Sequence, residues 1–512
     1  MEHIPEPEAG PMRRFPGAIL SSSALAVALA LTGCGAGAGG EASGTQGTSA
    51  ASASAGVDAG TSTTDTTTAD STLFTDGTSH TVSVTWSEDD YAAMIAADGS
   101  KDWIAADITI DGTTVSNVGV RLKGNSTLRS LSGNGAGGGG MGGNAASSGI
   151  SSDVPESLPL LIRFDKYVDG QTYQGLGEVS LRPGSPVLNE ALALALTGAS
   201  GQATQRYAYT TYSVNGSPTQ TRLLVENPDE DYADTLFDTP GVLYKADADS
   251  SFTYQGDDLA TYGDQFKQLN NEDSETVQPI VDFLKWLSEA TDEEFDSGLA
   301  ERVDVESFAR YTATMNLLVN GDDMAGPGQN YYLWYSLDTK KISVISWDLN
   351  LAMTGDATAS PEAQLSIGGG GAGGGGNQGT GGGMQPPGSD DGGWAPFAGA
   401  AADADSTAGA AGGTGAGGTG AGGAGGPGGG GRGGNELKER FLASEAFQSV
   451  YDAAYADLYA QLYASGTAAG LLDSIAAVVP LSDGLTAEEL AGETQTLRTF
   501  IQQRTDALKD QV

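Results

Sequence analysis

The chain has 512 residues and a formal net charge of -42 at pH 7, which argues against the basic footprint of a nucleic-acid-binding protein and suits a surface facing cations. One cysteine and two histidines exclude an intrachain disulfide or a Cys/His zinc site, and Ser-His-Asp or Cys-His catalysis would depend on His80 alone. Catalysis would therefore use carboxylates, amides, hydroxyls, Lys or Arg, and any metal would be an oxygen-ligated Mg²⁺, Mn²⁺ or Ca²⁺.

The N-terminal segment 1–34 has the pattern of a bacterial lipoprotein signal peptide. Two arginines precede an apolar run from Phe15 to Leu31, which is short for a membrane-spanning helix. The Leu-Thr-Gly-Cys sequence that follows resembles a lipobox, in which the cysteine carries lipid. We expect Cys34 to be lipidated and the protein to be extracytoplasmic and anchored to the bacterial cell membrane, with an uncleaved anchor as the alternative.

Residues 35–71 are almost all small or polar and are expected to form a disordered tether. Folded sequence begins near Thr72, where apolar periodicity predicts an α+β domain over 72–359. Strands are expected at 80–86, 103–110, 115–122, 158–164, 179–182, 206–215, 221–226, 241–245, 331–335 and 342–346. Helices are expected just after Ser87 and at 189–196, 277–289, 292–300 and 305–319.

One predicted strand ends in Arg121-Leu-Lys123-Gly-Asn125, followed by Ser and Thr. Cations followed by Gly and hydroxyl residues can offer positive charge and backbone N–H groups to a phosphate. Turns have the same composition, so an ordinary turn remains the alternative. Lys245 ends another strand in a cation, and Glu226 ends a strand before an acidic segment.

Two Gly-rich segments, 132–152 and 360–434, have low complexity and are expected to be disordered insertions. Helical periodicity resumes over 436–465 and again over 468–508. The apolar faces of these helices need covering, so 435–512 is expected to pack back on the main domain.

Acidic and amide residues gather in the stretch from 320 to 350. A hairpin of the last two predicted strands would bring the loop of Asp322 and the residue Asp348 to the same end of the strand pair. With the amides Asn330 and Asn350, these acids could converge on one hard cation. The alternative is that the acids cap turns, as Asp and Asn often do.

Taken in their order and spacing, the motifs resemble the CotH family, secreted protein-kinase-like proteins first known from bacterial spore coats. The motifs are GVRLKGNST at 119–127, RFDKYVDGQTYQGL at 163–176, VNG and LLVE within 214–226, GVLYK at 241–245, VNGD at 319–322, QNYYLW at 329–334 and SWDLN at 346–350.

The resemblance implies a divergent, atypical protein-kinase-like α+β fold that transfers the ATP γ-phosphoryl group to Ser or Thr of itself or of envelope or secreted proteins. By position, Asp322 matches the first catalytic acid and Asp348 the acid that holds Mg²⁺ or Mn²⁺, with Asn330 and Asn350 as further metal candidates. Phosphoryl transfer needs charge neutralisation and positioning, not a Cys or His nucleophile. Arg121, Lys123 and Lys245 are candidate phosphate contacts, and Glu226 is a candidate partner of one of these cations. Asn125 and Arg163 complete the cofactor-binding candidates.

Two positions depart from the family pattern. Leucines fill most of the strand 158–164, where members often carry Lys or Arg, and leave Arg163 as its only basic residue. Position 350 is Asn where other members carry a second Asp. These departures favour, as the alternative, a catalytically weak surface module of the pseudokinase or cation-binding kind. A carboxylate-based hydrolase is a third and weaker hypothesis.

Overall fold

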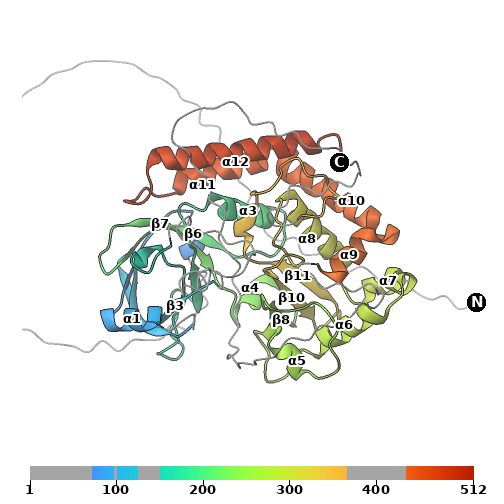
Figure 1. The fold of residues 1–512 in the computed structure, drawn as a ribbon, viewed down its shortest axis with the longest axis horizontal. Coiled ribbons are helices and arrows are strands. Elements are labelled where there is room, and N and C mark those ends of the chain that lie inside the picture. The colour runs from blue at the N-terminus through green and yellow to red at the C-terminus, as the bar shows by residue number, and fades with distance from the viewer. Residues whose placement is uncertain (1–71, 76, 97–100, 125–149, 366–433) are drawn as a thin grey trace, which may run out of the picture. The chain divides into compact units, whose positions relative to one another are not determined.

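The computed structural model describes residues 72–75, 77–96, 101–124, 150–365 and 434–512 (Figure 1). The predicted signal segment with Cys34, the tether, Asn125 and most of both Gly-rich segments lie outside the described residues. Within the described ranges, no helix combines the length and the apolar character needed to cross a bilayer. The mixture of helices and sheets confirms the α+β class.

Seven strands form a closed barrel in the order β1-β2-β3-β4-β5-β7-β6. The parallel pairing of β1 with β6 closes it, and the other neighbours are antiparallel. Each strand lies within two residues of its predicted range, but closure was not predicted from the sequence. The bounds are β1 His80–Thr85, β2 Ile104–Ile110, β3 Thr113–Leu122, β4 Leu160–Arg163, β5 Glu178–Leu181, β6 Tyr207–Val214 and β7 Gln220–Glu226.

Side chains of the barrel strands alternate between its interior and its outer surface, as the pleat requires. In β3, Val118, Val120 and Leu122 lie in the barrel core, so Arg121 and Lys123 face outward. In β5, Val179 and Leu181 lie in the core, which places Ser180 and the following Arg182 outside. One outer face of the barrel therefore carries cations from two strands.

A second sheet has the strand order β11-β10-β8-β9. One of its faces packs on the helices through Tyr244, Leu333 and Val344. The other face carries a small aromatic cluster that includes Tyr332 and Trp347. The bounds are β8 Gly241–Ala246, β9 Phe266–Gln268, β10 Tyr331–Ser336 and β11 Ile342–Ser346.

The helices before the second Gly-rich segment match the predicted ones, with the short α4 and α5 added. Helix α8 leads directly into the acidic loop. The chain turns at Val319, which has a positive φ of 50°. The bounds are α1 Glu88–Ala96, α3 Leu188–Ala199, α4 Tyr232–Leu236, α5 Ala260–Gly263, α6 Gln278–Glu289, α7 Asp292–Gly298 and α8 Val305–Leu317.

The C-terminal segment forms four helices that share the large core with α3 and α8. The helical pattern from residue 436 is interrupted at Ser444, whose hydroxyl accepts a hydrogen bond from the Ala446 N–H at 3.2 Å and so starts a new helix. Helix α10 packs on α8 and α11 on α3 (Figure 1). The bounds are α9 Glu436–Ala443, α10 Glu445–Tyr459, α11 Thr467–Val478 and α12 Ala487–Leu508.

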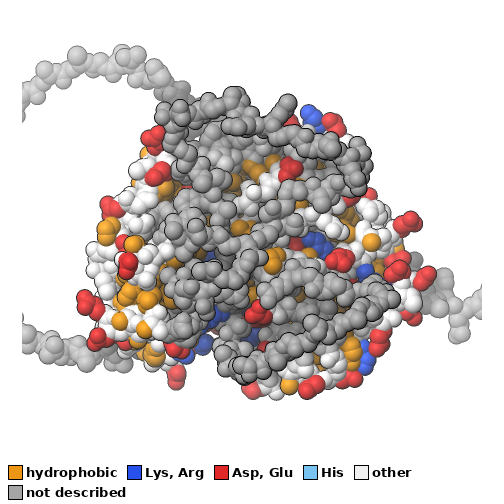
Figure 2. Space-filling model, in the orientation of Figure 1, with side chains coloured by type: hydrophobic (Ala, Val, Ile, Leu, Met, Phe, Trp, Pro, Cys, Tyr) orange, Lys and Arg blue, Asp and Glu red, His pale blue; other side chains and the backbone are white. Residues whose placement is uncertain are grey.

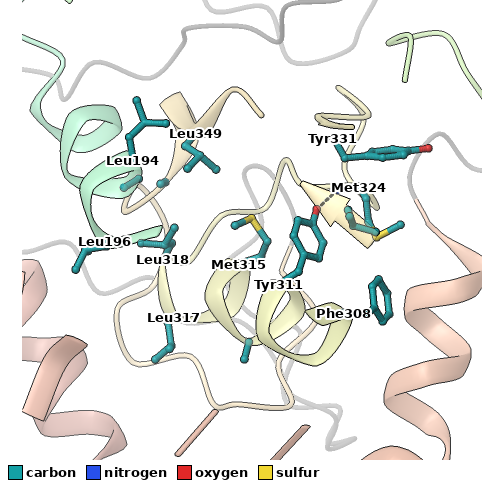
Figure 3. Packing of buried hydrophobic residues seen from close by; sticks show 14 of the residues in the cluster. Leu194, Leu196, Phe308, Tyr311, Met315, Leu317, Leu318, Met324, Tyr331 and Leu349 are labelled. Carbon is teal, nitrogen blue, oxygen red and sulfur yellow. Dashed lines mark hydrogen bonds between the residues drawn. The ribbon is translucent and has the colours of Figure 1, made fainter. Parts of the chain in front are cut away.

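One apolar core joins the elements that carry the candidate acids. Figure 3 shows leucines of α3, residues of α8 and Leu349, the neighbour of Asp348, gathered in this core. The hydroxyl of Tyr311 on α8 accepts a hydrogen bond from the backbone N–H of Met324 at 3.1 Å, which ties the acidic loop to the helix.

Arg504 of α12 joins the C-terminal helices to the end of α8 and is 0 % exposed. It donates to the carbonyl and side-chain oxygens of Asn316 at 2.8 and 2.7 Å, and to the hydroxyl of Tyr455 at 2.9 Å. A further hydrogen bond goes to the carbonyl of Ala359. A cation at this position also offsets the negative end of the α8 dipole.

Arg504→Met is expected to lower the free energy of unfolding by about 3 kcal/mol or more, because several buried oxygens lose their donor. Arg498→Met is the matched control on the same helix, since Arg498 is 44 % exposed and makes one surface ion pair. That change should cost less than about 1 kcal/mol. Urea unfolding measures both, and equal losses would contradict the assigned role of Arg504.

Candidate active site

The acidic loop folds around the carboxylate of Asp322, which is 2 % exposed. Its Oδ1 accepts the backbone N–H of Gly328 at 2.8 Å, and its Oδ2 accepts Nδ2 of Asn330 at 2.9 Å. Gly326 is required here, since a Cβ at that position would lie 2.5 Å from the Asp322 Cα. Burial, with the neighbouring charge of Asp323 adding to it, raises the pKa of Asp322 to about 6.

The second acid of the loop, Asp323, has a structural partner. Its Oδ1 accepts the N–H of Ala325 at 2.9 Å, and its Oδ2 pairs with Lys438 of α9. The N–H of Gly434 also donates to the carbonyl of Ala325 at 2.9 Å. Helix α9 therefore holds the acidic loop in place through Asp323.

The β10–β11 hairpin has the predicted register. Tyr331 pairs with Ser346, so Asn330 and Trp347 lie side by side at one end of the hairpin, and Asp348 follows directly. Asp348 is 2 % exposed and has a positive φ of 53°, an uncommon conformation for a residue other than Gly. The acidic loop and Asp348 thus meet at the same end of the strand pair, as expected from the sequence.

Arg182 joins Asp348 to the barrel, and the sequence analysis assigned it no role. Its guanidinium pairs with the Asp348 carboxylate and, through Nε, with Glu190 of α3 at 2.9 Å. Arg182 and Glu190 are 3 % and 2 % exposed. Arg222 of β7 supports the arrangement by donating from Nε to the Arg182 carbonyl at 2.7 Å.

A signal for this pair was present in the sequence. Glu190 is the single acid in the apolar run LNEALALAL, and a buried acid of that kind needs a cation. Its partner could not be identified from spacing, because Arg182 and Asp348 are separated by 166 residues.

Lys123 of the barrel and Lys245 of β8 meet on the ring of Trp347. Their ammonium nitrogens lie 4.8 and 5.3 Å from the ring centroid, and both side chains are about 5 % exposed. Lys123 also donates to Oδ1 of Asn227 at 2.8 Å. The outer face of the barrel and the aromatic face of the second sheet therefore come together next to Asp348.

The other predicted cofactor residues lie apart from this cluster or have partners of their own. Arg121 stacks on Trp103 at 4.9 Å. Arg163 has a side chain 43 % exposed and pairs with Asp165 and Glu178. Glu226 pairs with Arg206 at 2.6 Å, a cation that the sequence did not single out as its partner.

Two amides offer oxygen atoms that no described residue uses. Oδ1 of Asn330, and both Oδ1 and Nδ2 of Asn350, are buried without a hydrogen-bond partner. These oxygens and the nearby carboxylates are the donors that a hard cation prefers, so the residues fit a divalent metal. The described residues contain no group of three or more His, Cys, Asp or Glu placed to hold a metal alone.

Acidic side chains are scattered round the edge of the face shown in Figure 2, and Lys and Arg side chains are fewer there. The buried cations of the site thus contrast with the acidic surface.

Residues 149–508 match the model of the family described as CotH kinase protein, so the chain belongs to this family. Membership supports a kinase-like fold and a kinase-related function, and implies dependence on a nucleotide and a divalent metal at the level of the family. The match includes Asp322, Asp348, Arg182 and Lys245, and begins after β3. No curated protein matches the chain significantly.

The carboxyl of Asp229 lies close to three other acids, Glu178, Asp231 and Glu226. Burial raises the pKa of Asp229 from 3.8 to about 7, and the charges of Glu178, Asp231 and Glu226 add to this effect. The folded protein therefore holds this proton more tightly than the unfolded chain. Stability from Asp229 is complete below about pH 4 and is lost as the pH rises through 7.

Asp229→Asn is expected to stabilise the protein by about 1–2 kcal/mol at pH 8, because the amide carries no charge to be buried, and to change little at pH 4. Urea unfolding at both pH values measures the difference. Equal effects at the two pH values would contradict it.

Proposed function

We propose that the protein is a CotH-type protein kinase that transfers the ATP γ-phosphoryl group to Ser or Thr of itself or of neighbouring envelope proteins. The observation that supports this most is the buried Arg182 between Glu190 and Asp348. In protein kinases a Lys–Glu pair and a metal-binding Asp must be in place together for transfer. Arg182 and Glu190 supply such a pair here, although the strand that precedes β5 has no Lys.

The buried cations fit the phosphates of a nucleotide. Lys123 and Lys245 lie on the two facing surfaces next to Asp348, and Arg121 lies on the same barrel face as Lys123. The hydroxyl of Ser180 and the indole N–H of Trp347 are buried in this region without a partner among the described residues. Two buried donors without a partner, next to buried cations, favour an anionic ligand.

Each acid has a distinct part in the proposed reaction. When bound, ATP would supply the phosphoryl group, and Mg²⁺ or Mn²⁺ would neutralise its negative charge. Asp348, with Asn350 and Asn330, would hold the cation, and Arg182 fixes the Asp348 carboxylate. Asp322 orients the acceptor hydroxyl and accepts its proton, and a pKa of about 6 suits this near neutral pH.

The signal segment supports a location for this activity outside the cytoplasmic membrane. Lipid on Cys34 would anchor the chain, and residues 35–71 would separate the anchor from the domain. Acceptor proteins would then be other envelope or secreted proteins, or a second copy of the chain.

Asp348→Ala and Asp322→Ala are each expected to reduce phosphate incorporation at least about 100-fold, because the reaction loses its metal ligand or its proton acceptor. Incorporation from radiolabelled ATP with Mg²⁺ or Mn²⁺ measures this. Asp338→Ala is the control, since Asp338 lies exposed in the turn between β10 and β11. Incorporation that Asp348→Ala leaves unchanged would contradict the proposal.

A calorimetric titration separates this proposal from the cation-binding alternative. A kinase should bind an ATP analogue in the presence of Mg²⁺, and Arg182→Met should weaken that binding. Cation binding with no nucleotide binding would favour the surface module.

Arg182→Met is expected to abolish activity and to lower the free energy of unfolding by about 3–5 kcal/mol, because two buried carboxylates lose their cation. Arg182→Lys should keep part of the activity and part of the stability, since it preserves the charge but not the planar guanidinium group. Arg163→Met is the control, because the Arg163 side chain is 43 % exposed and lies apart from Asp348. Urea unfolding and phosphate incorporation are the measurements, and equal losses for Arg163→Met and Arg182→Met would contradict the assignment.

A further inference from the structure

Asp247 lies at the same end of the second sheet as the candidate acids, although no motif singled it out. Tyr332 of β10 pairs with Lys245 of β8, and this register, continued two residues beyond that last pair, would place Asn330 opposite Asp247. On the other side of β10, the register places Asn330 beside Trp347. Three strand ends thus present Asp247, Asn330 and Trp347 in one row, with neighbouring strands about 4.8 Å apart.

The alternation of side chains puts this row on one face of the sheet. Leu243, Tyr332 and Ile345 belong to the aromatic cluster of that face, and Trp347 does too. Asn330 and Asp247 are each two residues from a position on this face, so they continue the same side. This is the face on which Lys123 and Lys245 meet Trp347.

Asp247 has a buried oxygen that its local structure does not use. Asp247 is 5 % exposed, and its Oδ1 accepts a hydrogen bond from the backbone N–H of Asp249 at 2.9 Å. Oδ2 has no hydrogen-bond partner among the described residues. An Asn would make the same turn with its single oxygen, so the turn alone does not account for a second buried carboxylate oxygen.

Asn330 presents a second unused oxygen beside it. Its Nδ2 donates to Oδ2 and to the carbonyl of Asp322, at 2.9 and 3.2 Å. The opposite orientation would set the amide oxygen against the carboxylate, so the amide direction is fixed and Oδ1 points away from Asp322. This residue is 1 % exposed, and Oδ1 has no partner among the described residues.

We propose that Asp247 and Asn330 are oxygen ligands for a divalent cation at these strand ends, which makes Asp247 a metal-binding residue of the site. Two buried acceptors without a donor favour a cation, and carboxylate and amide oxygens are ligands of Mg²⁺ and Mn²⁺. Mg²⁺ is commonly held by one or two carboxylates, with water or phosphate oxygens completing its shell. The position of this cation relative to the phosphates rests on the proposed phosphotransfer function.

Charge at the site is consistent with this assignment. Burial raises the pKa of Asp247, and the charges of Lys101 and Lys245 act in the opposite direction. A divalent cation would offset the burial of this carboxylate. Asp247 would in turn supply the negatively charged ligand that the neutral Asn350 does not provide.

The test is a titration of the full chain with Mn²⁺, followed by electron paramagnetic resonance, first with Mn²⁺ alone and then with a non-hydrolysable ATP analogue. Asp247→Asn keeps the turn oxygen and removes the charge, and should weaken Mn²⁺ binding at least about tenfold. Asp249→Asn, two residues further on and exposed, is the matched control and should bind as the wild type does. Binding by Asp247→Asn equal to that of the wild type overturns the proposal.

Thermal unfolding gives a second measurement, because a cation that binds the folded state raises the Tm. Mn²⁺ should raise the Tm of the wild type and of Asp249→Asn more than that of Asp247→Asn. If Asp247→Asn does not fold, Asp247→Ser replaces it, since a Ser hydroxyl can accept the same turn hydrogen bond.

These readouts separate the cation site from the kinase activity. If Asp247→Asn weakens Mn²⁺ binding but the wild type incorporates no phosphate, the result would support the cation site and contradict the proposed function. Phosphate incorporation by a chain in which Asp247→Asn binds Mn²⁺ normally would support the function and overturn the site.

Discussion

The ion pair between Arg182 and Asp348 is the contact on which the candidate site depends, because it joins three separate parts of the fold. Arg182 follows a barrel strand, Asp348 follows the β10–β11 hairpin, and Glu190 on α3 binds the same guanidinium. Each group is buried, so each is costly to leave alone, and the pairing holds the three elements in one arrangement. The core around Leu349 and α3 supports it from behind.

Local signals in the sequence predicted most of the individual elements. The Asp111-Gly112 and Asn215-Gly216 turns have the positive φ values expected of tight hairpins. The aromatic strand from Tyr331 and the following apolar strand pair in the register that brings the two acids to one end. Such features depend on neighbouring residues, or on strands joined by one turn, so composition and periodicity are sufficient to find them.

Features formed by distant segments were not predictable in this way. Closure of the barrel depends on the parallel pairing of β1 with β6, whose strands lie far apart in the chain. The partners of Arg182 and Lys438 are likewise set by tertiary packing. Glu226 pairs with Arg206 because the two residues lie at adjacent strand ends. For the cations, the sequence predicted the kind of residue the site needs, and packing decided which of them it uses.

Charge placement explains why an acidic chain can hold an anionic ligand. The chain has a net charge of -42, and the long-range field of exposed charges is screened beyond about 10 Å at moderate salt. Lys123, Lys245 and Arg182 lie in the interior, where the lower dielectric strengthens their effect. Cations buried this deeply are costly unless carboxylates or a ligand balance them. Asp348 and Glu190 pair with Arg182, and Lys123 and Lys245 lie over the ring of Trp347 beside them. These buried cations concentrate positive charge next to Asp348, which is where the proposed function would place a phosphate group.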